Sequence, residues 1–358
     1  MRATLQTIAD AVGVSRSTVS NAYGRPDQLS PELRERILAT ATELGYPGPH
    51  PTARSLRRGR VDAIGVLFTA RLSMAFSDPF AVAYLRGLAE VAERRDTSLL
   101  LIPVPYVEDD AALRAVRNAA VDAFCVYGVP DWHRAWDLVR ARGLPLAGGG
   151  DPARLGPDAC YVGIDERAAA RRLGAHVAGL GHRHVAIVGE WVTETSHTHV
   201  VTGTTPDRLR FYTTGERVRG FADALAAAGI AWPDVTLVNA ADNDRASGAA
   251  ATELVDRLAG GATAILATSD VLALGVLDGL AARGLRPGRD VSVTGFDDIP
   301  EAAAAGLTTI RQPGVEQGRL VGELLLVGAD SATARHRLLP TTLEVRASTG
   351  PAPRKARP

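Results

Sequence analysis

The chain has 358 residues, and its 40 basic and 40 acidic side chains give a formal net charge of zero at pH 7. It contains only two cysteines and no run of 18 apolar residues, which argues against a disulfide-stapled secreted scaffold and against a membrane span. A chain of this length exceeds one ordinary hydrophobic core, so it predicts more than one domain.

Residues 4–24, TLQTIADAVGVSRSTVSNAYG, predict two short helices that meet in a tight turn at Gly13. Ile8 lies on the inner face of the first helix, Ser15 is a good N-cap for the second, and Val19 lies on the inner face of the second. Such a pair is typical of the helix-turn-helix unit, whose second helix enters the major groove of DNA.

Three polar side chains of the second helix, Arg16, Ser17 and Asn21, are predicted to point away from that inner face. Arginine can grip guanine through two hydrogen bonds, and serine and asparagine can both donate and accept. The pattern therefore favours a surface that reads base edges. The alternative is a three-helix fragment packed on a larger domain, in which Arg16 and Asn21 are merely solvated.

A third helix is predicted to begin after its N-cap, Ser30, with Pro31 at its first position, and to end at Gly45. Its predicted inner face consists of Leu33, Ile37, Ala41 and Leu44.

The connector that follows, YPGPHPTARSLRRGR, has four arginines and no acid in its last eight residues. Residues 1–60 hold nine arginines against five acids, whereas the rest of the chain holds 31 basic and 35 acidic residues. The neutral total therefore hides a basic N-terminal segment, and a basic stretch beside a helix-turn-helix indicates contact with the DNA backbone.

These motifs resemble those of the lactose-repressor (LacI/GalR) family of bacterial transcription regulators, and the resemblance runs nearly from end to end. Members open with a pattern like T-L-x-x-[VI]-A-x-x-A-G-V-S-x-x-T-V-S, followed by S-P-E-x-R-x-R-[VI]-x-x-x-A-x-E-L-G-Y and A-R-S-L. This chain carries Thr4, Leu5, Ile8, Val14, Ser15, Thr18, Val19 and Ser20, then SPELRERILATATELGY, then ARSL at 53–56. It departs from the pattern at Gly24, where the family usually has Asn, and in a connector that is one residue longer, which shifts the hinge geometry.

The resemblance implies that residues 51–58 form a hinge helix that folds only on operator DNA, with Leu56 wedged into the minor groove between Arg54 and Arg57. An eight-residue helix is too short to be stable alone in water, and an apolar wedge that unstacks a base step bends DNA. The alternative is a flexible basic linker with Leu56 on its surface. The DNA contacts we expect are from Thr4, Ser15, Arg16, Ser17, Thr18, Asn21, Arg54, Leu56 and Arg57.

The remaining residues alternate apolar runs with helical patterns, which indicates parallel sheets covered by helices. The predicted strands are 63–68, 98–103, 121–127, 184–189, 235–240, 264–269 and 290–296, and the predicted helices are 80–95, 109–119, 166–180, 216–228, 246–258 and 271–283. We expect an α/β core of two doubly wound lobes, divided near 165–180 and rejoined near 307–313, with a cleft between them that resembles periplasmic sugar-binding proteins.

The predicted domains are therefore a three-helix DNA-binding domain at 1–49, a hinge at 50–60, a two-lobed effector-binding and dimerisation core at 61–350, and a tail without regular structure at 351–358.

Ligands in doubly wound sheets bind beyond the carboxyl ends of the strands. Strand-end logic combined with the family resemblance predicts effector contacts from Phe80, Asp165, Arg217, Ser269 and Asp297. For each acid the alternative is a helix cap. We favour the cap for Asp270, which follows Ser269, and ligand contact for Asp297.

The family often stacks an aromatic ring on its ligand, and the loose alignment of AADNDRASG offers Asn243 at that place. This substitution predicts an effector held more by hydrogen bonds than by stacking, such as a sugar or polyol.

Residues 190–215 form a connection longer than the family pattern leads us to expect, and they are rich in threonine. A loop of this length is typically functional or disordered, and a mobile lid over the cleft is the favoured interpretation. His197 and His199 could be read as metal ligands, but the pair has no nearby cysteine or carboxylate partner, so we expect no metal.

No phosphate-binding loop, dinucleotide fingerprint or nucleophile elbow occurs, so we expect neither an enzyme nor a cofactor. The two alternatives are a periplasmic solute-binding protein, which needs an export signal, and a sugar-processing enzyme.

We expect a cytoplasmic, nucleoid-associated repressor. Its predicted partners are a pseudo-palindromic double-stranded operator, a sugar-like effector and a second copy of the chain, but no membrane. The ending RASTGPAPRKARP has no heptads, which favours a homodimer over a tetramer.

Overall fold

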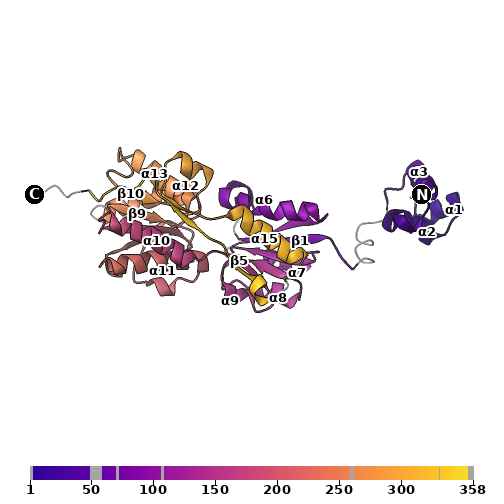
Figure 1. The fold of residues 1–358 in the computed structure, drawn as a ribbon, viewed down its shortest axis with the longest axis horizontal. Helices are drawn as coiled ribbons and strands as arrows, with labels where there is room; N and C mark the ends of the chain where they lie inside the picture. The colour runs from indigo at the N-terminus through magenta and orange to yellow at the C-terminus, as the bar shows by residue number, and fades with distance from the viewer. Residues whose placement is uncertain are drawn as a thin grey trace, which may run out of the picture. The chain divides into compact units, whose positions relative to one another are not determined.

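The computed structural model describes residues 3–48, 59–69, 72–105, 109–258, 262–329 and 331–353. Its internal contacts divide the chain into two compact units, Met1–Asp62 and Ala63–Pro358. Figure 1 shows the helices of the first unit in indigo and the two lobes of the second unit, each a sheet with helices against it.

The N-terminal unit contains three helices, α1 (Leu5–Val12), α2 (Arg16–Gly24) and α3 (Pro31–Glu43), with a 3-10 turn, η1 (Pro26–Gln28), before α3. Gly13 ends α1 with φ at 76°, a left-handed conformation that favours glycine. The core consists of Ile8, Ala9, Val19, Ala22, Ile37 and Ala41. The three predicted helices are confirmed. Leu44 was predicted on the inner face, but it is 42% exposed because α3 ends before it.

The first lobe of the second unit is built on a parallel sheet with strand order β12-β5-β4-β3-β1-β2. Its strands are β1 (Ala63–Thr69), β2 (Ser98–Val104), β3 (Ala123–Tyr127), β4 (Leu146–Gly148), β5 (Cys160–Gly163) and β12 (His336–Leu338). Buried residues alternate between the two faces of β1, so Ile64 packs in the cluster with α6 (Pro79–Arg94) and α15 (Gly314–Leu326). Leu67 packs in the cluster with α7 (Asp110–Asn118) and α8 (Ala135–Ala141).

The second lobe has a five-stranded sheet with the order β10-β9-β6-β8-β7. Its strands are β6 (Val185–Glu190), β7 (His199–Val201), β8 (Thr236–Ala240), β9 (Ala264–Ala267) and β10 (Ser292–Thr294), and only β7 pairs antiparallel. One face carries α10 (Glu166–Gly179) and α11 (Tyr212–Ala227), and the other carries α12 (Arg245–Leu258) and α13 (Asp270–Ala281). The predicted α/β class with two doubly wound lobes is confirmed.

The chain passes between the lobes three times. It leaves the first lobe between β5 and α10, and it returns between β11 (Thr309–Arg311) and α15. It crosses again from β12 to β13 (Thr342–Glu344), which pairs antiparallel with β11. In Figure 1 the yellow α15 lies beside the purple α6 in the first lobe, although they are far apart in sequence. This packing is close, because a Cβ on Gly318 would lie 1.9 Å from the carbonyl oxygen of Tyr84.

All seven predicted core strands form within two residues of their predicted ends. The shorter elements α5 (Met74–Ser77), α9 (Pro152–Leu155), η2 (Pro206–Arg208), η3 (Trp232–Asp234), α14 (Pro300–Ala304) and α16 (Ala332–Arg335) complete the unit. The last crossing, after β12, was not predicted, because strands of three residues lack a readable periodicity. The backbone N–H of Ala352 donates to the carbonyl of Leu180 at 2.9 Å, so the core extends past its predicted limit at residue 350.

Residues 190–215 have regular structure of their own, and their role as a mobile lid over the cleft stays a prediction. They include β7 and η2, and the buried side chain of Asn239 holds them in place. Its oxygen accepts from the N–H of Thr193 at 3.0 Å, and its amide donates to the carbonyls of Thr195 and His197 at 3.3 and 3.1 Å. The buried side-chain amide of Asn239 therefore satisfies backbone groups of residues 193–197 that would otherwise need water as a partner.

Candidate functional sites

The exposed start of α2 is the first candidate site. Arg16 and Ser17 are exposed there, and Asn21 lies half-buried one turn further along. The amide of Asn21 donates to the side-chain oxygen of Gln28 in η1 at 3.1 Å, which fixes the direction of its free oxygen. This contact was not predicted, because Gln28 lies in the short 3-10 turn η1, which has no readable periodicity.

Two of the predicted DNA contacts are helix caps in the structure. The hydroxyl of Thr4 accepts from the N–H of Thr7 at 3.2 Å, and the hydroxyl of Ser15 accepts from the N–H of Thr18 at 3.0 Å. The Ser15 hydroxyl also lies 2.7 Å from the hydroxyl of Thr18. These side chains therefore set the start of each helix, which is where helix N–H groups and Arg16 can face an anionic backbone.

The three hinge residues Arg54, Leu56 and Arg57 lie outside the described residues, so their roles stay predictions.

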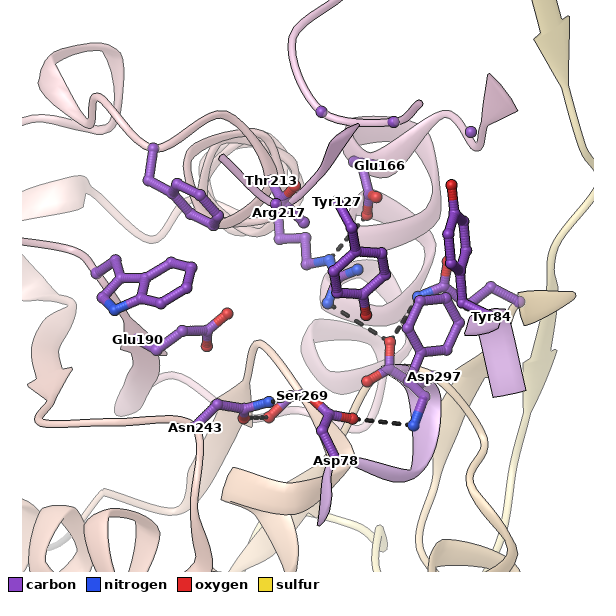
Figure 2. Close-up of a pocket in the computed structure, with 18 of the residues that line it drawn as sticks. Asp78, Tyr84, Tyr127, Glu166, Glu190, Thr213, Arg217, Asn243, Ser269 and Asp297 are labelled. Atoms are coloured by element: carbon purple, nitrogen blue, oxygen red, sulfur yellow. Dashed lines mark hydrogen bonds and ion pairs between the residues drawn. The ribbon is translucent and has the colours of Figure 1, made fainter. Parts of the chain in front are cut away.

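The second candidate site is a pocket between the two lobes of the second unit. Its walls come from the carboxyl ends of β1, β3, β4, β5, β6, β8, β9 and β10 and from α6, α10, α11 and α15. Figure 2 shows the charged side chains that point toward one another there. Five of the six predicted effector contacts line this pocket, namely Phe80, Arg217, Asn243, Ser269 and Asp297.

Asp165 does not line the pocket, contrary to the prediction. Its carboxylate accepts from the N–H of Ala168 at 2.9 Å and caps α10, and its side chain is exposed. The next residue, Glu166, faces the pocket instead. For Asp165 the alternative interpretation, that the acid caps a helix and does not contact a ligand, is therefore the right one. Asp270 is also structural, since it accepts from the N–H of Ile299 at 2.9 Å.

Arg217 is the centre of a buried ion-pair network. Its Nε donates to Glu166 at 2.8 Å, and its Nη1 donates to the carbonyl of Thr268 at 2.6 Å and lies 3.6 Å from Asp297. The guanidinium also lies 3.8 Å from the ring centre of Phe296. Its charge is therefore already matched by two carboxylates before any ligand arrives.

Asp297 has an unusual backbone in addition to its buried carboxylate. Its φ is 121°, a value that residues with a Cβ rarely adopt. Its N–H donates to the carbonyl of Ile310 at 2.8 Å, and its carboxylate accepts from the amide of Gln312 at 2.5 Å. Burial raises the pKa of Asp297 well above its ordinary value, while Arg217 opposes that rise. Such strain held by surrounding contacts is common at ligand sites.

Glu190 supplies a further buried carboxylate at the end of β6. Its two oxygens accept from the hydroxyl of Thr268 at 2.7 Å and the hydroxyl of Thr214 at 3.3 Å. Burial raises the pKa of Glu190 and of Glu166. Neither acid was predicted, although Glu190 directly follows a predicted strand and strand-end logic could have found it.

Asn243 joins the two lobes at the edge of the pocket. Its amide donates to Asp78 of the first lobe at 3.1 Å, and its oxygen accepts from the hydroxyl of Ser269 at 2.5 Å. Asp78 also caps α6 by accepting from the N–H of Phe80 at 2.9 Å. Asn243, a predicted effector contact, therefore also forms a hydrogen bond between the two lobes.

Aromatic rings from other elements line the pocket, and the expectation of an effector held more by hydrogen bonds than by stacking stays a prediction. Trp191 and Phe211 meet edge to face with ring centres 4.5 Å apart, and Phe68 stacks on Tyr127 at 4.9 Å. Trp191 and Phe211 come from the two ends of the long 190–215 connection, whose composition is polar between them.

The comparisons with known proteins cover both units. The family model described as bacterial regulatory proteins, lacI family, matches residues 4–48, and a periplasmic binding protein-like domain matches residues 175–349. A helix-turn-helix-type transcriptional regulator of Mycobacterium tuberculosis is 39% identical over 354 residues, which covers 98% of each chain. The chain belongs to the lacI family of transcriptional regulators.

Solved structures of lacI-family regulators agree with this assignment. A family member from Corynebacterium glutamicum has a TM-score of 0.73 at 32% identity and covers 99% of this chain and 100% of its own. The complex of the regulator CelR with cellobiose has a TM-score of 0.66 at 27% identity and covers 97% of this chain and 100% of its own. These relatives are regulators and not enzymes, so the sugar-processing alternative does not hold.

A second contact between lobes lies beside the pocket in this lacI-family core. The guanidinium of Arg210 from the second lobe lies 4.7 Å from the ring centre of Trp132 in the first lobe. The neighbouring Asp131 has its pKa raised to about 7, because burial and the charge of Asp151 disfavour its ionised form. The opposing charges of Arg210 and Arg219 limit the rise.

His197 and His199 have rings 4.6 Å apart, with Nδ1 of His199 3.0 Å from the carbonyl oxygen of His197. Within the ranges that the structure describes, no group of three metal-ligating side chains forms. In the same ranges no helix is long and apolar enough to cross a membrane.

Proposed function

We propose that this regulator binds a pseudo-palindromic operator as a homodimer and represses transcription. A sugar or a related polar metabolite, bound between the lobes, controls its operator affinity. The observation that carries the proposal is the pocket whose walls come from both lobes of a chain with a lacI-type helix-turn-helix.

Base reading is assigned to Arg16, Ser17 and Asn21, because these side chains lie on α2 outside the packed core. Thr4, Ser15 and Thr18 hold the helix starts and have hydroxyls that can contact phosphate oxygens. For the hinge, Leu56 is the proposed minor-groove wedge between Arg54 and Arg57. Two recognition helices of a dimer then read two half-sites about one DNA turn or a multiple apart.

Effector contacts are assigned to Phe80, Arg217, Asn243, Ser269 and Asp297, with Glu166 added. Phe80 comes from the first lobe, whereas Arg217 and Asp297 come from elements of the second. A ligand that binds between them favours the lobe arrangement that holds it best. Since two hinge segments must enter one minor groove together, a change in lobe angle changes operator affinity.

A two-part experiment tests this proposal on the full chain. Selection from random duplex DNA identifies the operator, and a thermal-shift screen of sugars and small metabolites identifies the effector, because a ligand that binds the folded state raises its melting temperature. Operator affinity is then measured by fluorescence anisotropy with and without the effector. The proposal expects a palindromic site and a change of about 5- to 150-fold on adding effector. An unchanged operator affinity with every ligand that binds contradicts it.

A further inference from the structure

The pocket suits a small ligand. Its volume is about 150 Å³, and a cavity of about that volume accommodates one six-membered ring. Trp191 and Phe211 provide an apolar wall, whereas Glu166 and Asp297 provide oxygen atoms, so the wall suits a ring with one apolar face and polar edges.

The charges of the pocket are strongly asymmetric. Among its described lining residues, five carboxylates face one arginine, and there is no lysine or histidine. The acids are Asp78, Glu166, Glu190, Asp242 and Asp297. Figure 2 shows four of them arranged around Arg217.

The charge of Arg217 is already matched by Glu166 and Asp297, so it offers little net positive charge to an anionic ligand. Its side chain is 7% exposed, and its Nε and Nη1 are engaged with Glu166 and the carbonyl of Thr268. Bringing a phosphate or carboxylate here adds a like charge to a buried site that already holds more acids than bases. Burial raises the pKa of Asp78, Glu166 and Glu190, which is the signature of a site that already disfavours negative charge.

The oxygens that remain point to hydroxyl donors. Glu166 binds Arg217 through Oε2, and Asp297 binds Gln312 through Oδ1, so Oε1 of the first and Oδ2 of the second are placed to accept from a ligand. Adjacent hydroxyl groups on a ring donate in this geometry without carrying charge.

We propose that the effector is an uncharged single-ring compound with several hydroxyl groups, and that the pocket rejects its phosphate esters and its acids. This inference rests on the proposed function, because it specifies the ligand of the same site. It separates this chain from the regulator CelR, whose solved complex holds the disaccharide cellobiose.

The test uses isothermal titration of the full chain with matched probes. The panel contains neutral monosaccharides and cyclic polyols, the phosphate monoester and the uronic acid of each where it exists, and cellobiose. At least one neutral single-ring probe binds, and its phosphate ester binds about 100-fold more weakly, because like-charge contact in a desolvated site costs several kcal/mol. Comparable or tighter binding of a phosphate ester, an acid or cellobiose overturns the inference. The proposed regulatory function fails separately from this inference if a probe binds the pocket but leaves operator affinity unchanged.

A substitution provides an independent check of the electrostatic cause. Glu166→Gln removes one partner of Arg217 with little change in shape, so the penalty against the phosphate ester falls by at least several-fold relative to its neutral parent. Glu216→Gln is the matched control, since Glu216 lies next to Arg217 on α11 but pairs with Arg219 at 2.8 Å outside the pocket. An equal phosphate-to-neutral ratio in wild type and Glu166→Gln contradicts the proposed cause.

Discussion

The start of α2 and the pocket between the lobes place their polar groups in opposite settings. In the N-terminal unit, Arg16 and Ser17 are exposed above an apolar core that includes Ile8 and Val19. In the pocket, Arg217 and its carboxylates are themselves part of the interior. The residues proposed to read DNA can therefore be changed with little loss of folding, whereas the residues proposed to bind the effector also contribute to stability.

The largest expected effect tests the buried side of this comparison. Arg217→Ala removes the partner of Glu166 and Asp297 and leaves uncompensated buried charge, so it lowers the free energy of unfolding by about 3–5 kcal/mol. Arg245→Ala is the control, because Arg245 pairs equally closely with Asp278 but both side chains are about half exposed. That loss is about 0–1 kcal/mol. Urea unfolding followed by circular dichroism measures both, and similar losses for the two variants contradict the account.

The exposed side is tested by Arg16→Ala. The variant loses about 1–3 kcal/mol of binding to its preferred operator and relaxes selectivity at one base position, while its unfolding curve stays that of wild type. Arg25→Ala removes an exposed charge at the far end of α2 and should leave selectivity intact. Selection from random DNA reads out both variants. Unchanged base preference in Arg16→Ala would show that this side chain does not read the sequence.

A smaller effect distinguishes two serines at the start of α2, Ser15 and Ser17. Ser15→Ala removes the N-cap of α2 and lowers the stability of this unit by about 1 kcal/mol. Ser17→Ala leaves the cap residue in place and removes only an exposed hydroxyl that lies 2.7 Å from the hydroxyl of Ser15, so the stability changes by about 0.5 kcal/mol or less. Thermal unfolding of each variant measures the difference. Equal melting temperatures for the two would place the cap elsewhere.

The smallest expected effect concerns pH at the contact between lobes. Asp131 has a folded-state pKa of about 7, above its ordinary value of 3.8, so its ionisation costs stability as the pH rises from about 4 to about 7. Asp131→Asn keeps the neutral form at every pH. The variant therefore melts higher than wild type by a larger margin at pH 8 than at pH 5, as thermal unfolding at both values would show. A margin independent of pH would contradict the raised pKa.

The sequence was most informative where local rules decide the structure. Caps and turns at Thr4, Gly13 and Ser15 depend on neighbouring residues, and the long apolar runs predict the core strands. Strand-end logic brought Ser269 and Asp297 to the pocket, because the carboxyl ends of parallel strands share one edge.

The pocket was predicted only in part because its details depend on contacts between distant segments. Whether Asp165 or Glu166 faces the pocket is decided by which of them caps α10, and both residue types are common at the start of a helix. Trp191 and Phe211 reach the pocket through a connection held by the distant Asn239. No local pattern carries this information.

The claim that the pocket controls the DNA-binding unit is tested most directly with Asp297→Asn. This change removes the charge but keeps the shape, and Arg217 retains Glu166 as its partner. Operator affinity is measured by fluorescence anisotropy, with and without the effector, for wild type and variant. We predict that the variant binds the operator within a few-fold of wild type but no longer responds to the effector. Loss of operator binding by the folded variant without effector, or an effector response equal to that of wild type, would contradict it.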